Sequence, residues 1–158
     1  MTAAAFTFPS MSATLRRMCK PPDRGKAMRV TATERDLLTG FADLSCPLDS
    51  FGHSEHVRLA WTLLAEQPLL EAMRTFRRLL QAYAEHYDAA DKYNETITCF
   101  YLLLIRERMD RLDADHDWNE FQLANADLFG SAKKFLEPWY PAGVAFSPEA
   151  KAGFRLPG

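Results

Sequence analysis

The chain has 158 residues, of which 47% are hydrophobic and 12% aromatic, so it can build one packed core and is not a wholly disordered chain. Its longest uninterrupted apolar run, Cys99 to Ile105, is far shorter than the ~20 residues needed to cross a bilayer. The formal net charge of -2 is unevenly distributed, because residues 1–30 hold six basic residues and one acidic residue whereas the remainder holds 13 basic and 20 acidic. Such an acidic body excludes a nucleic-acid surface, and we expect neither a nucleic-acid nor a membrane partner.

The chain begins with a basic segment. Residues 1–29 combine positive charge with two adjacent prolines and a glycine, which is typical of a solvated arm. We therefore predict a disordered leader over 1–29 and one helical domain over 30–158. No basic region precedes an apolar run of signal-peptide length, and the three cysteines are scattered without a Cys-x-x-Cys pair. These features favour a reduced, cytoplasmic location.

The first three predicted elements are amphipathic helices. Thr31 or Thr33 caps a helix whose apolar residues recur at three- and four-residue spacing and which ends before the next proline. The Asp49-Ser50 pair caps a second helix that runs to about Gln67. A third helix carries one apolar stripe over 69–87.

The fourth predicted helix is the most apolar element. Residues 97–105 leave almost no polar face, and a helix that is apolar on all sides is buried on all sides, so we predict it to be the central helix. Shorter helices follow around 118–126 and up to Leu136, and an irregular tail begins at Pro138. With no strand of period two, the chain is predicted to be an all-α, single-domain bundle of about five to six helices with an irregular, proline-containing C-terminal tail.

Two histidines, His53 and His56, form the feature with the clearest chemical meaning. They are three residues apart in the second predicted helix, so both imidazoles lie on one side, within reach of one ion. Ala60 and Leu63 follow on the same side, which indicates that the pair faces the core. The positive end of the helix dipole disfavours imidazolium, and neutral imidazole is the form that binds a metal.

Glu95 is the candidate third ligand, because it lies at the start of the most apolar helix and supplies the anionic group that two histidines lack. Two histidines and one carboxylate with open positions are typical of catalytic zinc or non-haem iron. We predict that His53, His56 and Glu95 hold one divalent metal, zinc or iron, in a small metalloprotein that is a candidate enzyme of unassigned reaction. Lys92, Tyr93 and Thr96 would then line the pocket and bind a small-molecule ligand, and Thr98, which also lies near Glu95 in the sequence, could orient Glu95 or a substrate.

The same residues allow two other interpretations. In one, the cluster binds a small polar or anionic ligand without metal. In the other, it is a buried polar network in a structural or protein-interaction module, with Lys92 as the partner of Glu95 and the helix dipole contributing ~0.3 to 1 kcal/mol. We predict that His86 and His116 are solvated, although His86 is also placed to supply a further ligand. Cys99 lies in an apolar run, which raises a thiol pKa and argues against a nucleophile.

Two segments, Phe51–Trp61 and Lys92–Thr98, resemble segments of a group of small bacterial helical proteins of unknown function. In that group a Phe-x-His-x-x-His-Leu-x-x-Ala segment precedes a Lys-Tyr-His-Glu-Thr-Ile-Thr segment, and the tail Ser147–Phe154 is similar too. The resemblance covers residues 33–156 and marks the positions of both histidines and Glu95. Asn94 stands where the group has a histidine, so a role for that third histidine is not carried over. The resemblance implies no established activity.

Overall fold

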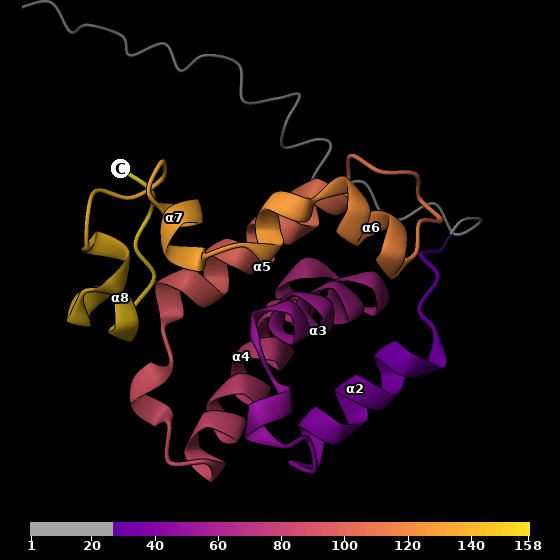
Figure 1. The fold of residues 1–158 in the computed structure, drawn as a ribbon, viewed down its shortest axis with the longest axis horizontal. Helices are drawn as coiled ribbons and strands as arrows, with labels where there is room; N and C mark the ends of the chain where they lie inside the picture. The colour runs from indigo at the N-terminus through magenta and orange to yellow at the C-terminus, as the bar shows by residue number, and fades with distance from the viewer. Residues whose placement is uncertain (1–26) are drawn as a thin grey trace, which may run out of the picture.

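The computed structural model describes residues 27–158, which form seven α-helices and four short 3-10 turns, as the all-α prediction requires. Figure 1 shows the helices packed around one another without a sheet, and the only β-type contact in 27–158 is an isolated bridge between Arg29 and Asp117. Residues 1–26 of the predicted leader lie outside the described residues. Arg29, the last residue of that leader, is bound to the domain, because its backbone N–H donates to the His116 carbonyl and its side chain to the Asp115 carbonyl.

Polar groups set where the first helices begin. In α2 (Ala32–Ala42), the Thr31 backbone N–H donates to the Glu34 carboxylate, which closes the predicted N-terminal cap. The next helix, α3 (His53–Glu66), starts later than predicted, because Asp49 and Ser50 form part of a separate 3-10 turn over Leu48–Ser50 and do not cap α3. Gly52 is the residue that precedes α3. The following helix, α4 (Leu69–His86), begins after Pro68 as predicted.

The most apolar segment forms α5 (Glu95–Met109), whose N-terminus is capped by Asn94. Three short helices follow: α6 (Trp118–Ala124), α7 (Ala132–Leu136) and α8 (Pro148–Ala152). The tail is therefore more regular than predicted, because Ser147 caps α8 and Pro148 stands at its first turn, where its missing N–H is no loss. No helix within 27–158 has the length and hydrophobicity needed to cross a bilayer.

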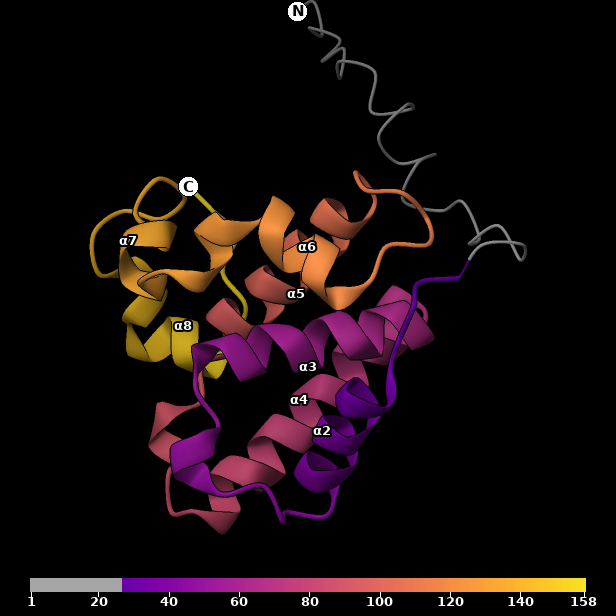
Figure 2. The same ribbon diagram turned by 45° about the vertical axis from the view of Figure 1, so that its right-hand side comes forward.

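Two helices share the centre of the bundle. Figure 2 shows α3 running across the middle, with α2 and α4 on one side of it and α5 to α8 on the other. Helix α3 contacts α2, α4 and α5, and helix α5 contacts α3, α4 and α8. The prediction of one central helix around residues 97–105 therefore describes only half of the arrangement. Helix α3 is equally central, because its Leu59, Trp61 and Leu63 are fully buried.

The prediction that His116 is solvated is wrong. The side chain is only 3% exposed. Its Nε2 accepts a hydrogen bond from Trp61 Nε1 at 3.2 Å, and its Nδ1 donates to the Asp113 carbonyl at 2.7 Å. The acidic residues around it face solvent while the ring turns inward, because a histidine with both nitrogens bonded can be buried at little cost. His86, by contrast, is exposed as predicted.

Candidate functional site

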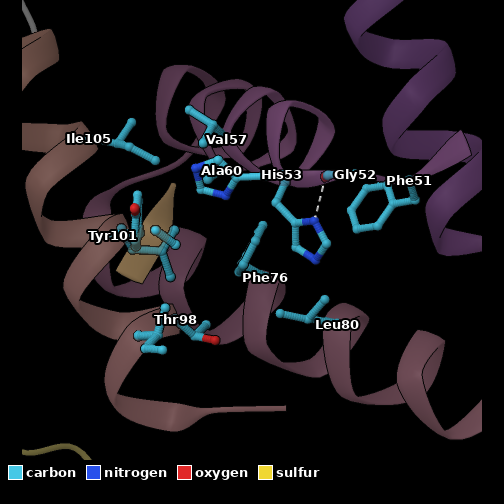
Figure 3. Close-up of a pocket in the computed structure, with 14 residues that line it drawn as sticks. Phe51, Gly52, His53, Val57, Ala60, Phe76, Leu80, Thr98, Tyr101 and Ile105 are labelled. Atoms are coloured by element: carbon cyan, nitrogen blue, oxygen red, sulfur yellow. Dashed lines mark hydrogen bonds between the residues drawn. The ribbon is translucent and has the colours of Figure 1, made fainter. Parts of the chain in front are cut away.

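A cavity of about 290 Å³ lies between α3, α4 and α5, next to the start of α3 (Figure 3). Its wall includes both predicted histidines, together with mostly apolar side chains. Helix α3 and the residues before it contribute Phe51, Gly52, His53, His56, Val57 and Ala60, whereas α4 contributes Phe76 and Leu80. The remaining wall residues are Ile97, Thr98, Tyr101, Leu102 and Ile105 of α5 and Ala132 of α7. The cavity is therefore bordered by four helices, of which α3 and α4 are consecutive and α7 is the most distant in the sequence.

Small residues explain why this part of the bundle is hollow. Ala60 and Ala132 stand on the wall, where their short side chains fill little of the space between the helices. Protein interiors are otherwise packed with few voids larger than a water molecule. A cavity of this size beside a well-packed core therefore needs an explanation, and binding of a small molecule is the usual one.

Both histidines lie on the cavity wall, so the prediction that they face inward is confirmed. His53 Nε2 is 2.7 Å from the Leu128 carbonyl oxygen, and its ring meets the Tyr101 ring edge-on at 5.4 Å between centroids. His56 Nδ1 is 2.7 Å from the Gly52 carbonyl oxygen, and its ring lies 4.0 Å from that of Phe51. Each ring is held by one backbone carbonyl and one aromatic neighbour, which fixes its orientation.

These hydrogen bonds determine the tautomers. A carbonyl only accepts, so the N–H must be on Nε2 of His53 and on Nδ1 of His56. In the neutral rings the other nitrogen, Nδ1 of His53 and Nε2 of His56, carries a lone pair. Burial lowers the pKa of His56 below its usual value and the positive charge of a protonated His53 would lower it further, although the bond to Gly52 opposes the shift. At neutral pH His56 therefore offers an acceptor to the cavity.

Two further wall residues, Thr98 and Tyr101, carry hydroxyl groups and come from α5. In Figure 3 the Thr98 hydroxyl points away from its helix toward the side where Leu80 lies. The Tyr101 hydroxyl is different, because it is enclosed by protein atoms and is the buried side-chain polar atom in 27–158 that lacks a hydrogen-bond partner. Burial raises the pKa of Tyr101 to about 12, so the group stays protonated. Tyr101 was not among the predicted site residues, and Thr98 was expected only as a neighbour of Glu95.

Glu95 lies outside the cavity wall and already has partners. Arg77 contacts its carboxylate at 2.7 Å, and the Tyr93 hydroxyl donates to it at 2.6 Å. The Cys99 thiol is 3.5 Å from the same carboxylate, and burial raises the pKa of Cys99 to about 11, in agreement with the sequence expectation. Burial and the bond to Glu95 also raise the pKa of Tyr93. This cluster is a closed ion-pair network, in which Arg77 takes the place predicted for Lys92.

The three predicted ligand-binding residues are also outside the cavity. Lys92 is exposed on the turn before α5, and Tyr93 is turned toward Glu95. Thr96 is fully buried, where its hydroxyl donates to the Gly153 carbonyl and accepts from the Arg155 N–H. Thr96 therefore anchors the C-terminal tail.

Helix geometry explains this distribution. Successive residues of an α-helix are rotated by about 100°, so Thr98, Tyr101 and Ile105 share the face of α5 that lines the cavity. Glu95 then lies about a quarter turn from the centre of that face and Thr96 about half a turn from it. The repeat of 98, 101, 102 and 105 is the signal in the sequence that could have located the true wall.

No group of three or more His, Cys, Asp or Glu side chains suited to hold a metal ion occurs in the described range 27–158. Two of the three predicted ligands, His53 and His56, share one wall, while Glu95 is held by other residues. Comparisons of the chain with family models, with curated proteins and with solved structures gave no match. The functional argument therefore rests on the chemistry of the cavity.

Proposed function

We propose that this protein binds a small, mainly apolar molecule in the cavity between α3, α4 and α5. The observation that carries the proposal is the cavity itself, about 290 Å³ of space walled by Val57, Phe76, Leu102 and other apolar side chains. Sites of this kind are concave, mostly apolar and supplied with a few polar groups that fix the orientation of a ligand. His56 and Thr98 are such groups.

The volume of the cavity limits the size of the ligand. A dry engineered cavity of about 150 Å³ in another protein binds benzene, which has six heavy atoms. Scaled to the 290 Å³ found between these helices, the same packing corresponds to a ligand of about ten to twelve heavy atoms. The part of the ligand that the cavity holds is therefore compact, such as a bicyclic aromatic group.

The wall also limits the charge of the ligand. None of its residues is a lysine, arginine, aspartate or glutamate. A charged ligand would lose its hydration on entering without gaining a counter-charge, which is unfavourable. Of the interpretations that the sequence left open, the absence of charged wall residues favours a ligand site without metal. It favours a neutral ligand over an anionic one.

Naphthalene, with ten heavy atoms, is a direct probe of the proposal. We expect it to raise the melting temperature of the protein and to bind at micromolar concentration. Ala132→Leu would project a larger side chain from α7 into the cavity and should weaken binding at least tenfold. Ala65→Leu is the matched control, since Ala65 is a partly buried alanine that does not line the cavity. Absence of binding, or equal weakening by both variants, would overturn the proposal.

The rival proposal is the divalent-metal site of His53, His56 and Glu95. Its support is that both histidines line one cavity and that each keeps one lone-pair nitrogen in the neutral form. Glu95 could join them only after its contacts with Arg77 and Tyr93 were broken, so a half-buried ion pair and a hydrogen bond would have to be disrupted. This requirement makes the metal site the second candidate.

Metal analysis separates the two proposals. The rival predicts near-stoichiometric zinc or iron in protein purified without a tag, and its loss in both His56→Ala and Glu95→Ala. Arg77→Ala serves as a further comparison, because releasing Glu95 from Arg77 should strengthen metal binding if Glu95 is a ligand. Protein that is free of metal and does not bind added zinc or ferrous ion would eliminate the metal site and leave the ligand cavity unaffected.

A further inference from the structure

The polar groups of the cavity wall indicate which functional group the ligand carries. His56 donates its Nδ1–H to the Gly52 carbonyl, so that its remaining nitrogen, Nε2, is an acceptor with no hydrogen-bond partner within 27–158. Water can reach this nitrogen in the ligand-free protein, but a ligand that fills the cavity displaces that water and leaves the acceptor unsatisfied unless the ligand donates to it. The ligand should therefore carry at least one hydrogen-bond donor.

Thr98 supplies the complementary group from the other side of the cavity. It lies on α5, whereas His56 lies on α3, and its hydroxyl can both donate and accept. Within the described part of the chain this hydroxyl forms no hydrogen bond, although Thr98 is only 8% exposed. A ligand group that both donates and accepts would match the two wall residues.

The Tyr101 hydroxyl does not contribute to this recognition in the present arrangement. It also lacks a partner, but protein atoms cover it almost completely, so that a ligand in the cavity would meet the ring of Tyr101 and not its oxygen. The polar contacts of the ligand are thus limited to one imidazole nitrogen and one hydroxyl. Both belong to neutral groups, and no charged side chain lines the cavity.

We propose that the ligand is an uncharged hydroxyl compound, such as a phenol or a small apolar alcohol, whose hydroxyl donates to His56 Nε2 and accepts from the Thr98 hydroxyl. This inference rests on the proposed function, since it assigns the functional group of the molecule that the cavity holds. It excludes carboxylates and amines of the same size, because ionised groups find no partner there. His56 and Thr98 are the residues that determine specificity.

The test compares three probes of one shape by calorimetry at neutral pH: naphthalene, 2-naphthol and 2-naphthoate. We expect 2-naphthol to bind about tenfold more tightly than naphthalene, the effect of one or two net hydrogen bonds, and 2-naphthoate to show no measurable binding. His56→Phe keeps an aromatic ring beside Phe51 but removes the acceptor, so it should reduce the preference for 2-naphthol to less than threefold. Thr98→Val, a change of nearly equal volume, should reduce it by a smaller factor.

Ser54→Ala is the matched control, because Ser54 lies in the same turn of α3 and does not line the cavity. It should leave the preference unchanged. Equal binding of naphthalene and 2-naphthol would overturn the hydroxyl inference while the proposed function stands, and tightest binding of 2-naphthoate would do the same. Failure of all three probes to bind would instead overturn the proposed function. If His56→Phe does not fold, the Thr98→Val result decides.

Discussion

The two ends of α3 differ in whether their buried polar side chains have hydrogen-bond partners. Near the C-terminal end, Trp61 meets His116, and the indole N–H donates directly to the imidazole. Near the N-terminal end, His53 meets Tyr101, but their rings contact only edge-on and the tyrosine hydroxyl remains without a partner. At the C-terminal end the two polar groups are bonded to each other, although His116 also borders a separate, mainly polar pocket of about 370 Å³. The N-terminal end keeps an apolar cavity of about 290 Å³ and polar groups without protein partners in the described part of the chain.

We therefore expect the Trp61 end of α3 to contribute mainly to stability and the cavity end to contribute mainly to ligand binding. At the Trp61 end, the indole N–H and both imidazole nitrogens already have protein partners, so they stabilise the core and offer no free hydrogen-bonding group to a ligand. At the cavity end, His56 and Thr98 retain bonding capacity and small residues leave space. Natural proteins tolerate unfilled space and unpaired polar groups chiefly at functional sites, where a ligand supplies what is missing. Variants at the two ends should therefore differ in what they change.

The largest expected effect is at the end of α3 where Trp61 donates to His116. His116→Ala removes the acceptor of the Trp61 N–H, leaves that donor unpaired in the core and opens a cavity, so the free energy of unfolding should fall by about 3 kcal/mol. Urea unfolding followed by tryptophan fluorescence would measure it. His86→Ala is the control, since His86 is exposed and its loss should change stability by less than about 0.5 kcal/mol. Similar small effects of both variants would contradict the contrast drawn between the ends.

A smaller effect of opposite sign is expected at the cavity end. Tyr101→Phe removes a buried hydroxyl that has no partner, so it should raise the free energy of unfolding by about 1 kcal/mol in the ligand-free protein. The same change at Tyr140 should lower it by about 1 kcal/mol, because the Tyr140 hydroxyl donates to the Arg155 carbonyl at 2.9 Å. Thermal and urea unfolding of both variants would check the signs. If Tyr101→Phe destabilises as much as Tyr140→Phe, the hydroxyl is bonded in solution.

The smallest expected effect is the pH dependence contributed by His56. Burial lowers the pKa of His56 in the folded protein, so the unfolded chain binds its proton more readily. The stability that comes from this group is therefore complete above the ordinary value of 6.5 and is lost as the pH falls from there through the lowered pKa. Unfolding measured with a chelator present should show this slope in the native protein and a shallower one in His56→Gln. Equal slopes would show that His56 is not perturbed.

The C-terminal tail offers a further check on the assignment of Thr96. Thr96→Val removes the bonds to Gly153 and Arg155, so it should loosen the tail and lower the free energy of unfolding by about 1 to 2 kcal/mol. Binding of naphthalene should be unchanged, because Thr96 is on the opposite side of α5 from the cavity. Limited proteolysis of the tail, together with calorimetry, would measure the two effects. Loss of naphthalene binding would show that Thr96 belongs to the ligand site, as the sequence predicted.

The local features of the sequence were sufficient for the fold class and for most helix boundaries. Caps such as Thr31, the proline before α4 and the three- and four-residue apolar spacing act within a few residues, so their effects can be read without a tertiary structure. The inward direction of His53 and His56 followed from the same spacing. Local signals failed at Asp49-Ser50, where the two residues form part of a 3-10 turn and α3 begins only after Gly52.

The partners of the polar side chains were decided by tertiary structure alone. Glu95 starts the most buried helix as predicted, but a rotation of about a quarter turn places it on Arg77 and not beside the histidines. His116 is surrounded by acidic residues in the sequence, yet Trp61, 55 residues away, makes it a core residue. The sequence alone thus determined a bundle with a histidine pair facing inward. Which side chains meet depends on how each helix is rotated about its axis relative to its neighbours. Only the packing of the helices therefore determined that the histidine pair faces an apolar cavity.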